Sequence, residues 1–263
     1  QLRSVLDDFQ IDAVKIGMVY NSAIIKTIHT IVKEVKCPVV VDPIIESTTR
    51  TTLLKKSAIN DFKKMIIPLA TIITPNKKEA NILSGCNSVL KAAKKIQELG
   101  AKNVIITGSN ETKNEIDDLI LESDKDYNLK GGKIKMANHG SGCNYSASIT
   151  ASLAMKRTIR DSAQFAKEYV FQSIKNSKSL GKGINITFTK QSDMHKELSR
   201  SIVDFQNTKN ISELIPECQT NFVFSDLKPK KITDVLGISG RLVKSGKEII
   251  QAGNLIFGGS QRV

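Results

Sequence analysis

The sequence has no apolar run long enough to cross a bilayer. The longest, MIIPLATII, covers residues 65–73, whereas a membrane-spanning helix needs about 20 apolar residues. The N-terminus also lacks the basic-then-apolar pattern of a signal peptide. We therefore expect no membrane association and a soluble, cytoplasmic protein.

Cysteine is scarce, and its spacing excludes two kinds of structural site. Cys37, Cys86, Cys143 and Cys218 lie far apart and form no CxxC pair. Neither a zinc site nor a disulfide framework is therefore predicted. Three of the four are expected to be ordinary buried thiols, and Cys143 is the exception because it stands at the first turn of a predicted helix.

Arginine and aromatic residues are also few. The net charge is +13, but the excess is almost all lysine scattered along predicted helices, and only 5% of the residues are aromatic. Base readout and base stacking favour arginine and aromatic side chains, so no nucleic-acid partner is expected. A lysine-rich surface instead favours phosphorylated small molecules.

The 263 residues, 40% of them hydrophobic, suffice for one large core or for a core and a smaller second domain. From Asp12 to about Ser179, predicted strands alternate with predicted helices. The strands are expected at 12–18, 38–43, 71–74, 103–107, 117–121 and 132–137, and the helices at 22–35, 51–66, 76–84, 88–99, after Gly142 and at 160–177. This alternation predicts an α/β fold with a mainly parallel sheet covered on both faces.

A different pattern begins after the stretch GKGINITFT at 181–189. An amphipathic helix is expected at 193–206, followed by short strands and turns within 221–260. We therefore place a domain boundary near residue 190, with one domain at 1–190 and a partial α+β domain at 191–263. Because the chain starts at Gln1 and ends without a closing helix, we expect a fragment.

The stretch HGSGC at 139–143 places two glycines around a serine immediately before a helix of small residues. Gly140 and Gly142 allow close backbone approach, and the helix N-terminus directs amides and positive dipole towards an anion. Such an arrangement suits a phosphoryl group in transfer. A lowered thiol pKa would let Cys143 accept a proton from an attacking hydroxyl. A plain glycine turn explains the spacing equally well.

Asn76 and Glu79 in TPNKKEA stand three residues apart at the start of a predicted helix. An amide and a carboxylate at this spacing suit water-mediated magnesium binding beside nucleotide phosphates. The alternative, an N-cap with its capping-box partner, is favoured when this motif is taken alone.

Two further strand ends carry candidate residues. Asp42 in VVVDP ends a buried strand, where an unpaired carboxylate is costly, so it is either a metal- or phosphate-side residue or a turn aspartate. Thr107 and Gly108 in IITGS form either the edge of a nucleotide pocket or a turn. Ligands of open α/β sheets bind beyond the carboxyl ends of the strands, where all these residues are expected.

Together, DAVKIGM, VVVDP, ATIITPNKKEA, VIITGS and HGSGCNYSASI resemble the hydroxymethylpyrimidine and phosphomethylpyrimidine kinase family of thiamine biosynthesis. This family belongs to the ribokinase-like superfamily, most of whose members carry aspartate where Cys143 stands. The resemblance covers about residues 1–188. It implies a three-layer sandwich and the ATP- and magnesium-dependent phosphorylation of hydroxymethylpyrimidine and its monophosphate.

The resemblance also implies roles for individual residues. Cys143 takes the position of the catalytic base, and the amides of Gly140, Ser141, Gly142 and Cys143 form the anion hole. Asn76 and Glu79 organise magnesium, Asp42 lies near the metal and phosphates, Thr107 and Gly108 border ATP, and Met18 and Ile44 contact the pyrimidine. The role of Lys15 is left open.

The chain departs from the family pattern in two places. The loop IIESTTR at 44–50 replaces a small-residue loop that ends in glycine, so its phosphate contacts are in doubt. The glycine-rich segment that supplies much of the family's pyrimidine pocket is absent upstream of DAVKIGM. We therefore expect residues 1–263 alone to bind ATP weakly and to show little kinase or synthase turnover.

The stretches LIPECQTNFVF, GISGRLV and FGGSQRV resemble the start of an archaeal-type thiamine-phosphate synthase domain, whose anion-binding loop begins at FGGSQR. An unrelated α+β appendage is the alternative. Two other functions remain open: a pyridoxal-type kinase, which Cys143 disfavours, and a thiamine-phosphate-binding regulator, which the lack of a helix-turn-helix pattern disfavours. Among oligomeric states, a homodimer is left open.

Overall fold

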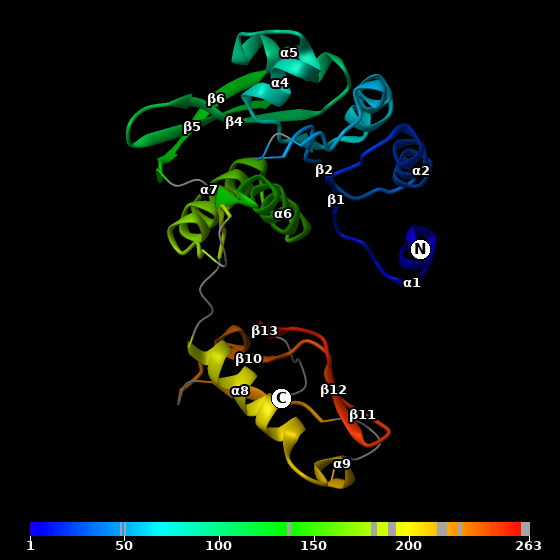
Figure 1. Cartoon of the computed structure of the whole chain (residues 1–263), viewed down its shortest axis with the longest axis vertical. Helices are drawn as coiled ribbons and strands as arrows, with labels where there is room; N and C mark the ends of the chain where they lie inside the picture. The colour runs from blue at the N-terminus through cyan, green and yellow to red at the C-terminus, as the bar shows by residue number, and fades with distance from the viewer. Residues whose placement is uncertain are drawn as a thin grey trace. The chain divides into compact units, whose positions relative to one another are not determined.

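A computed structural model describes residues 1–47, 49, 51–135, 138–179, 183–188, 193–214, 220–225 and 228–258. The chain forms two compact units, Gln1–Thr189 and Lys190–Val263, whose elements are labelled in Figure 1. Among the residues described, no helix is both long enough and apolar enough to span a membrane.

The first unit is built on a six-stranded sheet in the order β1-β2-β3-β4-β5-β6. Neighbouring strands from β1 to β4 are parallel, whereas β4, β5 and β6 are antiparallel. The strands are β1 (Val14–Ile16), β2 (Val39–Val41), β3 (Ile72–Ile73), β4 (Asn103–Glu111), β5 (Glu115–Glu122) and β6 (Lys125–Gly132).

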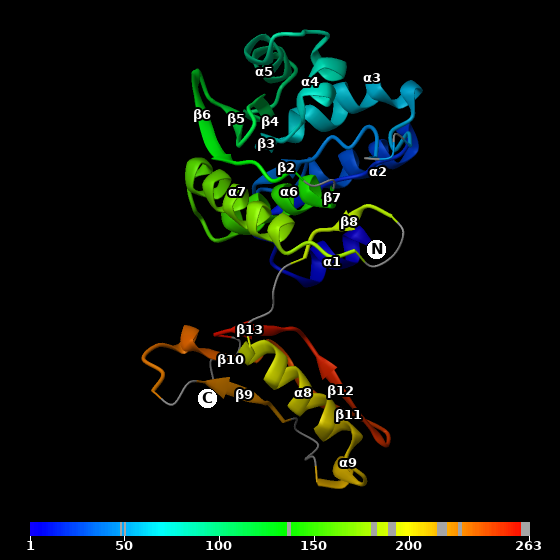
Figure 2. The ribbon, with the colours of Figure 1, turned by 60° about the vertical axis from the view of Figure 1, so that its left-hand side comes forward.

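Helices cover both faces of this sheet. The helices on one side are α2 (Ser22–Val32), the irregular helical segment 56–69 that contains α3 (Ile59–Asp61), α4 (Lys77–Ser84) and α5 (Val89–Glu98). Those on the other side are α6 (Ser141–Ala154) and α7 (Ile159–Lys175), as Figures 1 and 2 show. The predicted α/β three-layer architecture is therefore confirmed. A short helix, α1 (Leu2–Asp8), precedes the sheet.

Side-chain alternation along the strands explains the two apolar cores. In β2, Val39 and Val41 pack into the core beneath α2 and α4, while Val40 packs with Tyr145 and Ile149 of α6. All three valines are buried. A strand that is covered on both faces needs such a continuous apolar run.

The sequence prediction was wrong at the edge of the sheet. Strand β6 was not predicted at 125–132. Of the strand expected at 132–137, Gly132 is the last residue of β6, residues 133–135 are outside any strand, and 136–137 lie outside the described residues. Strands β5 and β6 form a hairpin that turns at Ser123, which has a φ of +52°. The sequence KDYNLKGG is polar and its burial alternates, so it lacks the apolar run that marks a central strand.

Two short strands near the end of the first unit pair with each other. Strand β7 (Asn138–His139) pairs in parallel with β8 (Asn185–Ile186).

The helix predicted at 51–66 is shifted along the chain and occupies residues 56–69. It contains a π-helical turn at Phe62–Ile66 and a final 3-10 turn with Pro68.

The second unit is α+β, as predicted. Helix α8 (Asp193–Asn207) packs through Leu198 and Ile202 on strands that contribute Leu236, Ile238 and Leu242. The remaining elements are α9 (Ile211–Leu214), β9 (Val223–Ser225), a 3-10 turn (Ile232–Asp234), β10 (Val235–Ile238), β11 (Arg241–Ser245), β12 (Glu248–Ala252) and β13 (Leu255–Phe257). Cys218 lies outside the described residues, as do residues 259–263 of the stretch FGGSQRV at 257–263, where the anion-binding loop was expected to begin.

Candidate active site

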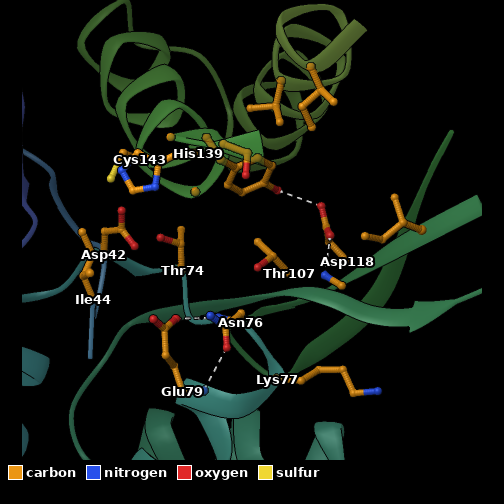
Figure 3. A pocket seen from close by; sticks show the side chains of 18 of the residues that line it. Asp42, Ile44, Thr74, Asn76, Lys77, Glu79, Thr107, Asp118, His139 and Cys143 are labelled. Carbon is orange, nitrogen blue, oxygen red and sulfur yellow. Dashed lines mark hydrogen bonds between the residues drawn. The ribbon is translucent and has the colours of Figure 1, made fainter. Parts of the chain in front are cut away.

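A cavity of about 840 Å³ opens at the carboxyl ends of the parallel strands of the first unit. Figure 3 shows Cys143 and His139 on one side of it, Asn76 and Glu79 on the opposite side, and Asp42 and Thr74 between them. Every residue that the sequence predicted for the site lines this one cavity: Met18, Asp42, Ile44, Asn76, Glu79, Thr107, Gly108, Gly140, Ser141, Gly142 and Cys143. The fold therefore brings together residues that are up to 125 positions apart, from Met18 to Cys143.

The glycine loop presents free amides to the cavity. Gly140 caps α6 with a φ of +95°, a conformation that disfavours any residue with a Cβ. The first helical hydrogen bond runs from the amide of Asn144 to the carbonyl of Gly140. In the described part of the chain the amides of Ser141, Gly142 and Cys143 donate to no backbone or side-chain acceptor. Such a helix N-terminus binds anions.

Cys143 is exposed at this helix terminus, but the prediction that its pKa is lowered is wrong. Desolvation within the cavity raises the pKa of the Cys143 thiol, and the carboxylates of Asp42 and Glu79 raise it further. The Lys15 ammonium acts in the opposite direction. The two carboxylates lie far along the chain from residue 143, so the sequence offered no sign of them.

The Asp42 side chain is buried, and its carboxylate contacts two other side chains. Its Oδ2 accepts a hydrogen bond of 2.8 Å from the Ser146 hydroxyl and lies 3.6 Å from the Lys15 ammonium. Desolvation raises the pKa of the Asp42 carboxyl, while the contacts with Ser146 and Lys15 lower it. Lys15 and Ser146 therefore stabilise the ionised form of a carboxylate that burial alone would disfavour.

Asn76 and Glu79 form the capping box at the start of α4. The amide of Glu79 donates to Asn76 Oδ1 at 3.0 Å, and the amide of Asn76 donates to Glu79 Oε2 at 2.9 Å. The helix-start interpretation of this motif is thus observed. Both residues also line the cavity, and burial raises the pKa of Glu79 to about 7, with the Asp42 and Glu46 carboxylates adding to the rise.

The donor chemistry at this end of the cavity suits a magnesium ion. Asp42 and Glu79 offer carboxylate oxygens whose mutual repulsion a cation would relieve, and Asn76 adds an amide oxygen. Magnesium prefers oxygen ligands and keeps several waters. Within the described ranges no group of three or more His, Cys, Asp or Glu side chains is placed to hold a metal ion, so water and phosphate oxygens would have to supply most of the ligands.

A buried charged cluster at the other end of the cavity was missed from the sequence. Asp118 accepts hydrogen bonds from the amide of Gly108 at 3.0 Å and from the Tyr145 hydroxyl at 3.2 Å, and it lies 2.8 Å from the Lys167 ammonium. Both Asp118 and Lys167 are buried. Two adjacent aspartates in a predicted strand, one of them certain to face the core, were the available signal.

Gly108 has a φ of +61° at the irregularity of β4, and the amide of Thr107 donates to the carbonyl of Pro75. Asp118 thus holds a turn at the cavity wall. The wall nearby is apolar and comprises Ile116, Ile134, Val170, Phe171 and Ile174. A flat heterocycle fits such a surface better than a charged group does.

Two family models match the chain. Residues 1–187 match the model described as Phosphomethylpyrimidine kinase, and residues 197–263 match the one described as Thiamine-phosphate synthase ThiN. A hydroxymethylpyrimidine/phosphomethylpyrimidine kinase of Aquifex aeolicus is 34% identical over 193 residues, which cover 71% of this chain and 76% of that protein. A pyridoxine kinase of Bacillus subtilis is 33% identical over 196 residues and covers 71% and 72% of the two chains.

Solved structures agree with the fold. The pyridoxal kinase from Staphylococcus aureus, determined in complex with AMP-PCP, superposes with a TM-score of 0.64 at 31% identity. The superposition covers 71% of this chain and 70% of that one.

Proposed function

Because the chain belongs to the phosphomethylpyrimidine kinase family, we propose that its first unit transfers the γ-phosphoryl group of ATP to hydroxymethylpyrimidine and to its monophosphate. The observation that supports this most is that one cavity is lined by the N-terminus of α6, the Cys143 thiol and the carboxylates of Asp42 and Glu79. These are the parts that phosphoryl transfer requires, because its catalysis rests on positioning and on charge neutralisation.

In this proposal the nucleotide lies along the β4 side of the cavity. Its base packs on the apolar wall near Phe171, and its sugar and phosphates pass Thr107 and Gly108 towards the glycine loop. Magnesium, held by Glu79 and Asn76 with Asp42 nearby, would neutralise phosphate charge. The amides of the loop then stabilise the phosphoryl group as its charge shifts.

Cys143 is the proposed base. In its thiolate form, Cys143 takes the proton of the acceptor hydroxyl as that oxygen bonds to the γ-phosphorus and the bond between this phosphorus and the bridging oxygen of ATP breaks. ADP is the leaving group, and the proton stays on the cysteine sulfur as a thiol. Lys15 supports this step because its positive charge favours the thiolate. Met18 and Ile44 line the cavity on the acceptor side and would contact the pyrimidine ring.

The second unit would serve the same pathway. Its match to the thiamine-phosphate synthase model supports a synthase domain fused behind the kinase. Together the two units would form a multifunctional enzyme of thiamine biosynthesis.

A pyridoxal-type kinase is the second candidate, because a pyridoxine kinase is among the similar proteins. The test is a coupled assay of ADP release by the complete natural protein, with hydroxymethylpyrimidine and pyridoxal as alternative acceptors. We expect kcat/KM to favour hydroxymethylpyrimidine at least tenfold. A preference for pyridoxal would establish the second candidate instead. Calorimetry with ATP should show that binding tightens when magnesium is added, and magnesium-independent binding would contradict the assigned carboxylates.

A further inference from the structure

The glycine loop is held by a segment from the far end of the first unit. Strand β8 pairs with β7, which leads directly into the loop, and Thr187 follows β8. The position of this segment is fixed from the other side as well. The amide of Phe188 donates to the carbonyl of Ser173 in α7, and the Lys178 ammonium lies 4.0 Å from the centre of the Phe188 ring.

Thr187 contacts the loop on both sides of the free amides. Its own amide and its hydroxyl each donate to the carbonyl of His139, both at 3.2 Å, and its Oγ1 accepts from the Asn144 side chain at 2.9 Å. A single hydroxyl therefore joins the residue before Gly140 to the residue after Cys143. Thr187 therefore holds both ends of the loop, and within the described part of the chain the three amides between them remain free to bind an anion.

The same hydroxyl explains part of the glycine requirement. A Cβ added to Gly140 would lie 3.0 Å from Thr187 Oγ1, which is closer than carbon and oxygen normally approach. Thr187 is not among the described residues that line the cavity. Any effect on the reaction must consequently pass through the loop.

We propose that Thr187 is a positioning residue that holds the amides of Ser141, Gly142 and Cys143 in the arrangement that receives the phosphoryl group. The proposal rests on the proposed kinase function. Preorganised donors stabilise a transition state because they need no rearrangement during the reaction. Without the Thr187 hydroxyl, the His139 carbonyl loses one donor and Asn144 loses its acceptor, so the loop samples other conformations.

The test compares three variants of the complete protein. Thr187→Val keeps the side-chain shape but removes the hydroxyl, Thr187→Ser keeps the hydroxyl, and Thr27→Val makes the same change on α2, where the hydroxyl bonds only within its own helix. We expect Thr187→Val to lower kcat about tenfold and to change the dissociation constant for ATP less than threefold. Thr187→Ser and Thr27→Val should stay within twofold of the unmodified protein in both.

Hydrogen–deuterium exchange separates this proposal from the proposed function. Exchange of the Asn144 amide, which donates to the Gly140 carbonyl at the end of the loop, should be faster in Thr187→Val and unchanged in Thr187→Ser and Thr27→Val, whether or not the protein is a kinase. Unchanged exchange, or an equal loss of kcat in Thr187→Ser, would overturn the positioning role. A lack of turnover in the unmodified protein, with exchange behaving as expected, would instead count against the kinase assignment.

Discussion

At the scale of single residues, Cys143 carries the most specific prediction. If its sulfur accepts the proton of the acceptor hydroxyl, Cys143→Ala should lower kcat about a hundredfold, since general bases contribute roughly 10² to 10⁴. The dissociation constant for ATP should change little, because the thiol acts on the acceptor and not on the nucleotide. Steady-state kinetics and calorimetry on the same preparation check both values.

A control at the same helix terminus is Ser141→Ala, which leaves the backbone amide in place. Its kcat should remain within about threefold of the unmodified protein. Unchanged turnover in Cys143→Ala would reduce the cysteine to a structural residue of the loop.

The raised pKa of Cys143 makes a second residue-scale prediction. The Asp42 carboxylate disfavours the thiolate and the Lys15 ammonium favours it, so Asp42→Asn should shift the pH midpoint of Cys143 alkylation downward and Lys15→Met should shift it upward. Iodoacetamide labelling across a pH series, read by mass spectrometry of the peptide that contains Cys143, measures the midpoint. Shifts in the same direction for both variants would contradict the electrostatic account.

Much of the site could be predicted at this scale because Asp42 and Asn76 each follow a buried strand, and a polar residue after a β-branched run marks such a strand end in the sequence. Thr107 was also expected at a strand end, but it lies inside β4, which continues past an irregularity to Glu111. The pKa of Cys143 could not be predicted, since it depends on carboxylates that only folding brings near. Lys15 was noticed within its motif, but its distance from Asp42 depends on the pairing of β1 with β2.

At the scale of elements, Asp118 links β4, β5, α6 and α7 through its contacts. Asp118→Asn would place an amide NH₂ against two donors, the Lys167 ammonium and the Tyr145 hydroxyl. Breaking a buried ion pair typically costs about 3–5 kcal/mol, so we expect a loss of this size in the free energy of unfolding of the first unit. Urea unfolding followed by circular dichroism measures it.

The matched substitution is Asp126→Asn on β6, where the side chain is exposed. Exposed positions usually change stability by less than about 0.5 kcal/mol. A comparable loss of unfolding free energy in both variants would show that the buried Asp118–Lys167 pair contributes no more to stability than an exposed carboxylate does.

The central elements could be predicted and the edge could not, for one physical reason. A strand covered on both faces must be continuously apolar, as VVV in β2 is, whereas burial alternates along the edge strand β6, which includes charged residues. Lys167 crosses β6 at Gly131, where an added Cβ would collide with its side chain. Such a glycine is indistinguishable from a turn glycine until the partner helix is known.

At the scale of the whole molecule, each unit has an apolar core of its own. We therefore expect two thermal transitions in calorimetry. A ligand that binds one folded unit stabilises that unit by about 2.7 kcal/mol at a hundred times its dissociation constant. ATP with magnesium should accordingly raise one transition and leave the other in place, whereas a shift of both would show energetic coupling between the units.

The pairing of β7 with β8 also limits where recombination during evolution could separate the two units. Ile186 and Thr187 belong in sequence to the stretch that leads towards the second unit. Ile186 nevertheless pairs with His139 of β7, and the amide and hydroxyl of Thr187 donate to the His139 carbonyl. A recombination point placed before residue 185 would separate Thr187 from the glycine loop that it contacts. Any exchange that preserves the kinase must therefore carry residues 185–188 with it, so the functional end of the first module lies beyond the last helix of its sandwich.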